Sequence, residues 1–184
     1  INGSGKIKFQ EIFEDINYSI YSDDKDFKFN SKLLLSELNF NSQEYLKNFI
    51  TNLDKTTTLK DQKIEINLDK KKLLINGQGK IKFNNDFEDI KFKVLKIKNK
   101  FDFNTQLDLD KTSFKIKFLN FVKNDKLKTR IKFLGSYETE NSLIFEDISI
   151  INENNRLIFK NIFLDKNNLI EKVDKVNLEF LDNQ

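Results

Sequence analysis

The residues Ile75-Asn76-Gly77-Gln78-Gly79-Lys80-Ile81-Lys82-Phe83 decide the fold of this chain, because residues 1–9 repeat them with one difference. The offset of 74 residues continues without a gap, and 18 of 40 aligned residues are identical between 1–40 and 75–114. Such a duplication predicts modules stacked side by side. We therefore expect a partial first repeat unit, residues 1–74, and a second unit, residues 75–184.

Apolar and charged residues alternate along both units. Phe101 and Phe103, for example, are separated by Asp102. A period of two places one set on each side of a pleated sheet. Polar clusters recur about every dozen residues from Asn84 onward, which is the spacing of hairpin turns. The sequence thus predicts a mainly β protein, a repeated antiparallel β meander curled into an apolar groove.

Two segments depart from this alternation. Asn41 can cap a helix, and Glu44 stands where a capping box requires it, so we predict a short helix over residues 42–53. In the second unit, Val94 and Leu95 are adjacent apolar residues in a strand, which predicts a β-bulge that bends the sheet.

The composition narrows the classes of function. The chain has 32 basic and 29 acidic residues, a net charge of +3, and no His or Cys. The usual general base and the strongest nucleophile are missing, and a thiolate metal site is excluded. The acidic residues are expected in turns or on the charged side of strands. We therefore expect a non-enzymatic protein without metal or cofactor.

Several stretches resemble known binding motifs but lack residues that these motifs require. The cluster Asp23-Asp24-Lys25-Asp26 lacks the glycine and the distal Glu of a calcium loop. Ile81 stands after Gly79-Lys80 where a phosphate loop needs Ser or Thr. Lysines and aromatic residues alternate and so lie on opposite faces, whereas a nucleic-acid surface needs both on one face. We expect no nucleic-acid partner.

The apolar set of the second unit supplies candidate binding residues. A groove lined by such side chains would favour acyl chains by about 0.8 kcal/mol for each buried CH₂ group. The candidates for the lining are Ile81, Phe83, Phe101, Phe103, Leu107, Leu109, Phe114, Ile116, Phe118, Ile131 and Phe133.

The rhythm of residues 75–184 resembles the AsmA-like superfamily, the AsmA, TamB and YhdP type of periplasmic lipid-transfer proteins. The resemblance covers the Ile-Asn-Gly-x-Gly-Lys-Ile strand and the later segments Leu107-Asp108-Leu109, Phe114-Lys115-Ile116, Phe121-Val122-Lys123-Asn124, Ile144-Phe145 and Leu157-Ile158-Phe159. It implies a long periplasmic β structure, anchored in the inner membrane, that carries phospholipid towards the outer membrane. Because the chain contains no Met and opens as if within a strand, we expect a fragment whose anchor lies outside this sequence.

A second interpretation fits the same alternation. The apolar residues could form the closed core of a sandwich or barrel that serves as a structural or adhesive module and holds no ligand. The sequence leaves open whether the apolar face is covered by protein.

Overall fold

The computed structural model describes residues 1–23, 25–42, 50, 52–116, 121–125, 127–138, 143–153, 155–165 and 169–180. This part of the chain consists of strands and connecting turns, with no helix. Eleven strands form a single antiparallel sheet and two short strands form a separate hairpin. The mainly β meander expected from the sequence is confirmed.

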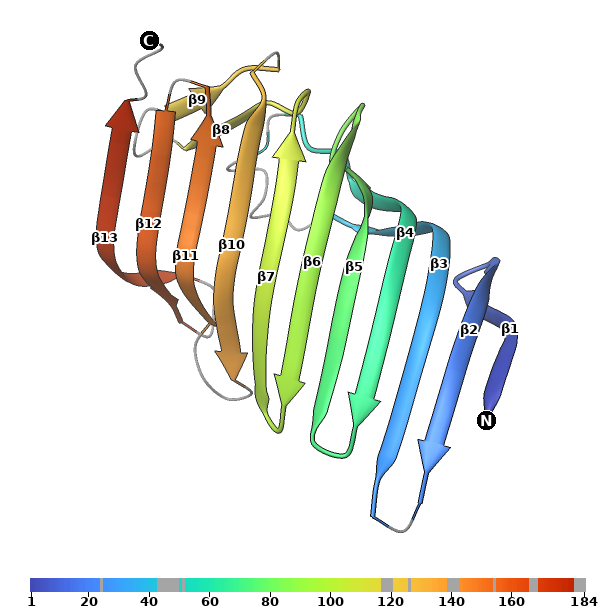
Figure 1. Cartoon of the computed structure of the whole chain (residues 1–184). Helices are drawn as coiled ribbons and strands as arrows, with labels where there is room; N and C mark the ends of the chain where they lie inside the picture. Colours follow the sequence, from blue (N-terminus) through green and yellow to red (C-terminus); the bar gives the residue numbers. More distant parts are fainter. Residues whose placement is uncertain are drawn as a thin grey trace.

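The large sheet follows the chain order from one edge to the other (Figure 1). Among the described strands its two edges remain apart, so the sheet does not close on itself. Its strands are β1 (Asn2–Phe9), β2 (Ile12–Ser22), β3 (Phe27–Asn41), β4 (Thr56–Asp69), β5 (Lys72–Lys82), β6 (Phe87–Ile97), β7 (Lys100–Leu109), β10 (Thr129–Glu138), β11 (Leu143–Asn152), β12 (Asn155–Leu164) and β13 (Ile170–Phe180). The hairpin consists of β8 (Phe114–Ile116) and β9 (Phe121–Lys123).

The sequence repeat corresponds to four strands of the sheet. Residues 74 apart lie on β1 and β5, on β2 and β6, and on β3 and β7. Gly3 pairs with Tyr18, and Gly77 pairs with Phe92 at the equivalent position. The division between residues 74 and 75 falls inside β5, so the sheet continues through it without a break.

In both repeat units a glycine faces an aromatic ring, and the ring occupies the space that a side chain on the glycine would need. A Cβ on Gly77 would lie 2.1 Å from Cζ of Phe92, and a Cβ on Gly3 would lie 2.5 Å from Cζ of Tyr18. Each ring therefore covers the backbone of the opposing strand, a cross-strand contact that a larger residue would prevent.

Strand pairing separates the side chains into two faces. A continuous register row on one face, called the apolar face, crosses all eleven strands of the large sheet: Gly5, Ile16, Leu33, Ile64, Gly77, Phe92, Thr105, Phe133, Ile148, Phe159 and Val176. The opposite face, called the charged face, carries most of the Lys, Asp and Glu residues of the strands. This is the distribution expected of an antiparallel sheet that is half buried.

The two local departures predicted from the sequence are not found. Val94 and Leu95 lie in a regular ladder, because Leu95 pairs with Leu74 on the charged face and no bulge is needed to turn it inward. Of the expected helix, residues 43–49 and 51 lie outside the described part. Ile50 forms an antiparallel bridge with Phe114, and Asn52 has a φ of 55°, so neither of these residues is helical.

Candidate functional site

Over much of the apolar face, the described residues form no second layer. A second register row, two residues along from the first, contains Gly3, Tyr18, Ser31, Ile66, Ile75, Val94, Phe103, Gly135, Phe145, Ile162 and Val173. Most of its large side chains, Ile66, Val94 and Phe103 among them, are only partly buried. Near the C-terminal edge Val173 and Val176 are 37% and 45% exposed. Many aliphatic and aromatic side chains of these two rows are therefore partly exposed, whereas Leu33, Phe159 and Ile162 are buried.

One end of the apolar face is covered. The β8–β9 hairpin and Ile50 pack there against the ends of the strands, in a core cluster that includes Ile50, Phe114 and Ile116. Figure 1 shows the hairpin beside the strand ends at this end of the sheet. The cluster also contains Phe83, which directly follows β5, and the strand residues Ile81, Leu109, Ile131, Ile150, Leu157, Phe159 and Ile162.

The covered end contains six of the candidate lining residues. Ile81, Phe83, Leu109 and Ile131 lie in the core cluster with Ile50 and the hairpin, each between 2% and 7% exposed. Phe114 and Ile116 belong to the hairpin itself, not to the sheet, and are also buried. These six are closed off from solvent by protein.

Four candidates lie on the apolar face and remain partly exposed: Phe101, Phe103, Leu107 and Phe133. Phe103 and Phe133 both pack against Phe145, with ring centroids 5.6 Å and 6.2 Å apart respectively. Phe118, the last candidate, lies outside the described residues.

Sequence reasoning missed the contribution of the first unit and of β6, β11 and β12. Ile16, Ile64, Phe92 and Phe145 share the apolar face with the candidates. The signal was available, because each stands in the same alternation as its neighbours, but the register that aligns them across strands requires the structure.

A buried lysine anchors the hairpin to the sheet. Lys123, on β9, is fully buried, and its Nζ donates hydrogen bonds to the carbonyl oxygens of Asp110 and Thr112 at 3.1 and 2.8 Å. Burial lowers the pKa of this ammonium, an effect that the nearby carboxylate of Glu88 opposes. The lysine thus joins β9 to the segment that follows β7.

Glu88 and its repeat counterpart Glu14 are buried on the apolar side, 3% and 6% exposed. Glu88 accepts hydrogen bonds from the backbone N–H groups of residues 110, 111 and 112 at 2.9, 2.8 and 2.6 Å. Glu14 accepts from the N–H and the hydroxyl of Ser36, and this hydroxyl bond lowers the pKa of Glu14. Contrary to our expectation, these acidic residues do not lie on the charged face. They satisfy buried donors, which is the condition for burying a carboxylate.

Ion pairs link neighbouring strands on the charged face. Directly opposed residues form the pairs Lys32–Glu65, Lys80–Asp89, Arg130–Asp108, Arg156–Glu179 and Lys160–Asp147. Each pair is substantially exposed, so its contribution to stability is small, about 0–1 kcal/mol. The pairs do keep this side of the sheet hydrated and distinct from the apolar face.

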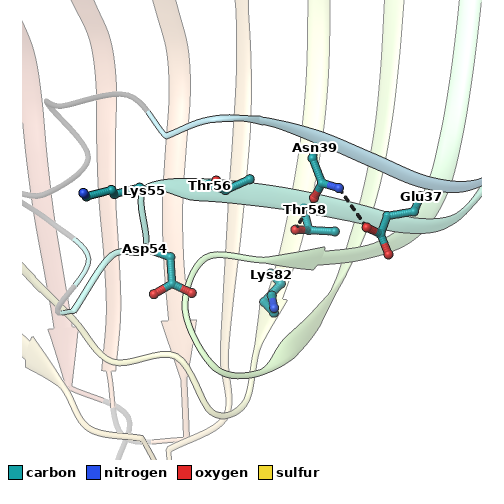
Figure 2. A pocket seen from close by; sticks show the side chains of 7 residues that line it. All are labelled: Glu37, Asn39, Asp54, Lys55, Thr56, Thr58 and Lys82. Carbon is teal, nitrogen blue, oxygen red and sulfur yellow. Dashed lines mark hydrogen bonds between the residues drawn. The ribbon is translucent and has the colours of Figure 1, made fainter. Parts of the chain in front are cut away.

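A polar hollow lies where β3 ends and β4 begins (Figure 2). Thr58 donates to Asn39, which in turn donates to Glu37, so the floor of the hollow is internally hydrogen bonded. The remaining lining residues are Asp54, Lys55, Thr56 and Lys82. Because both signs of charge are present and the polar groups of the floor already have partners, the hollow points to no particular ligand.

Within the described ranges, no group of three or more acidic side chains is placed to hold a metal ion, and no helix could cross a bilayer. Comparison of the chain with protein-family models, curated proteins and solved structures finds no match.

Proposed function

We propose that this chain binds the acyl chains of phospholipid on its apolar face. In this proposal it is a lipid-transfer segment of a long periplasmic protein of the AsmA-like type, anchored in the inner membrane by a segment outside this sequence. The whole protein would move phospholipid between the inner and outer membranes. The supporting observation is an apolar face that crosses eleven strands and on which many of the described apolar side chains, Ile66, Val94 and Phe103 among them, remain partly exposed.

The dimensions of the face suit this role. Eleven strands spaced about 4.8 Å apart extend for about 50 Å, which exceeds the roughly 30 Å hydrocarbon core of a bilayer. Each CH₂ group moved from water onto the face is stabilised by about 0.8 kcal/mol. Since this attraction has no directional component, an acyl chain could slide from strand to strand without breaking specific bonds.

The groove is the finer part of the proposal. Sheets of this size twist, and bulges bend them further. Register shifts occur at Lys60/Lys63 in β4, at Leu134/Gly135 in β10 and at Phe163/Leu164 in β12. We infer that this bending curls the sheet around the apolar face in the whole protein.

A test should measure lipid on the purified chain. After incubation with vesicles of phosphatidylethanolamine and phosphatidylglycerol, native mass spectrometry should detect bound phospholipid, and the chain should accelerate transfer of a fluorescent phospholipid between vesicles. Phe103→Arg should reduce both signals, because it places a charge on the face. Asn104→Arg is the matched control, since Asn104 is the next residue of β7 and lies exposed on the charged face.

Phe103 also packs against Phe145, so Phe103→Arg could disturb folding. Ile66→Arg on β4, with Asn67→Arg as its control, repeats the test at a residue of the first unit. A wild-type chain that carries no phospholipid and transfers none would refute the proposal.

The second candidate function is a structural or adhesive module without a ligand. It is favoured by the covered end, where the β8–β9 hairpin already fills part of the apolar face with protein. The same experiment separates the two functions, because a structural module would carry no lipid and would show no difference between Phe103→Arg and Asn104→Arg in transfer.

A further inference from the structure

Two strands of this sheet have nearly the same sequence but different surroundings. Residues 2–9 of β1 match residues 76–83 at all but one position. β5 has β4 on one side and β6 on the other, whereas β1 is the edge strand and pairs with β2 alone among the described strands. The β4–β5 pair therefore shows which neighbour a strand of this sequence can have.

The contact between β4 and β5 is centred on Gly79. β4 bulges opposite this residue, where Asp61 has a φ of 51° and the register shifts between Lys60 and Lys63. The side chain of Gln62 is fully buried there. A Cβ on Gly79 would lie 2.4 Å from Nε2 of Gln62 and 2.9 Å from the carbonyl oxygen of Asp61. Only glycine leaves room for this bulge.

At the bulge, the side-chain amide of Gln62 also donates hydrogen bonds to backbone carbonyl groups of both strands. Its Nε2 donates to the carbonyl oxygen of Lys80 at 2.7 Å and to that of Lys60 at 3.1 Å. Without this side chain the two carbonyl groups would lose a partner where the strands separate. The glutamine and the glycine thus form one structural unit between neighbouring strands.

Gly5, the counterpart of Gly79, lacks any such neighbour. No described atom lies within 4 Å of the Cβ that it would carry, and its φ is not in the left-handed region. Glycine weakens a strand, so a residue with a side chain would be more stable at this position. Gly3 differs, because the ring of Tyr18 explains the absence of a side chain there.

The free edge of β1 also presents the backbone groups that a partner strand needs. Ile1 and Ile20 exchange two backbone hydrogen bonds, of 2.8 and 2.7 Å. In an antiparallel ladder such pairs occur at every second residue, so the backbone groups of Ser4 and Lys6 face away from β2. The carbonyl group of Lys6 is the counterpart of the Lys80 carbonyl that accepts from Gln62.

We propose that the edge of β1 is a docking site for an antiparallel strand of the β4 type, supplied by a repeat unit outside this sequence and not by a second copy of this chain. The docked strand bulges opposite Gly5, places a glutamine-type amide over this glycine and donates to the carbonyl oxygen of Lys6. Such strand addition is an established mode of recognition, in which backbone bonds give affinity and a side-chain seat gives specificity. The proposal is independent of lipid binding.

The test uses the whole chain and a fluorescent peptide with the sequence of residues 56–69. Fluorescence anisotropy should show that the peptide binds, and hydrogen exchange should show new protection at the amides of Ser4 and Lys6. Gly5→Val should weaken binding at least about tenfold, the equivalent of one lost hydrogen bond or contact. A peptide with Gln62→Leu should bind to the wild-type chain about tenfold more weakly as well.

Ser4→Val is the matched control, because Ser4 lies on the same strand with its side chain on the other face. Its affinity for the peptide should remain that of the wild type. Gly5→Val should fold normally, since no described atom occupies the added space, and a thermal melt checks this. The proposal is overturned if the wild-type chain does not bind the peptide, or if Gly5→Val binds it equally. It is also overturned if sedimentation shows that a second copy of the chain occupies the edge and excludes the peptide.

Discussion

Glu88→Gln tests the buried carboxylate on β6 that binds the backbone directly after β7. One carboxylate oxygen of Glu88 accepts from the N–H groups of Lys111 and Thr112, and the other accepts from the N–H group of Asp110. Glutamine can keep one oxygen, but its NH₂ group then faces an N–H donor. One charge-assisted bond is lost, two are weakened and a donor loses its partner, which costs about 2–4 kcal/mol.

This magnitude can be measured at the affected amides. A loss of 2–4 kcal/mol in local stability should accelerate hydrogen exchange of residues 110–112 by about 30- to 1,000-fold. A change of 3 kcal/mol should also lower the melting temperature by roughly 6–12 °C in a chain of this length.

Glu65→Gln is the control for Glu88→Gln. It removes an exposed carboxylate that lies 3.4 Å from Lys32, and should change stability by less than about 1 kcal/mol. Equal effects of the two substitutions on exchange and on melting would refute the reasoning, because burial would then make no difference to the carboxylate.

Three further tests concern the packing and electrostatics of the sheet. Gly77→Val should cost about 1–3 kcal/mol in urea denaturation, because its Cβ overlaps the ring of Phe92, and Phe92→Ala in the same chain should relieve the overlap. Lys123→Met should destabilise the β8–β9 hairpin by about 1–3 kcal/mol, because two hydrogen bonds are lost, and Lys123→Ala should destabilise it further, because it also leaves a cavity. Both substitutions should accelerate hydrogen exchange of the hairpin amides. Exchange protection equal to that of the wild type would contradict the anchoring role of Lys123. Glu14 has a lowered pKa in the folded chain, so its contribution to stability is present above its ordinary pKa of 4.5 and disappears as the pH falls through the lowered value. Glu14→Gln should therefore flatten the acid side of a plot of unfolding free energy against pH. An unchanged acid side would show that the contact with Ser36 contributes nothing to stability.

The strands and the repeat were predictable because both depend on local periodicity. The alternation of residues such as Phe101, Asp102 and Phe103 fixes the period, and a period of two has one structural solution. The turn clusters then fix the order of strands in a meander. The prediction of a curled groove goes further than this, since alternation says nothing about curvature.

The buried ionic groups were not predicted, because their partners are distant in sequence. Glu88 lies 22–24 residues from the amides that it binds, and Lys123 lies 11–13 residues from its acceptors. One signal was present. Glu14 and Glu88 each stand two residues before an isoleucine of the apolar set, and therefore on the apolar side of the strand, in both copies of the repeat. A charge kept at an apolar position in both copies indicates a structural partner.

The same pair of carboxylates explains where the two repeat units diverge. In the first unit Glu14 binds Ser36, and β3 continues past this point to pair with β4 as far as Asn41. In the second unit Glu88 binds three successive N–H groups, which therefore cannot join a ladder, and β7 ends at Leu109. The chain leaves the sheet there and forms the β8–β9 hairpin before β10 begins.

This divergence decides which part of the apolar face is available to a ligand. The hairpin covers the strand ends, whereas among the described residues the register rows farther along the strands hold many partly exposed apolar side chains, with Leu33, Phe159 and Ile162 as buried exceptions. If these rows carry acyl chains, the path of transport is perpendicular to the strands, along the direction in which repeats stack. Each additional repeat of four strands would then lengthen the path by about 19 Å, so that repeat number, and not strand length, sets the distance over which lipid is carried.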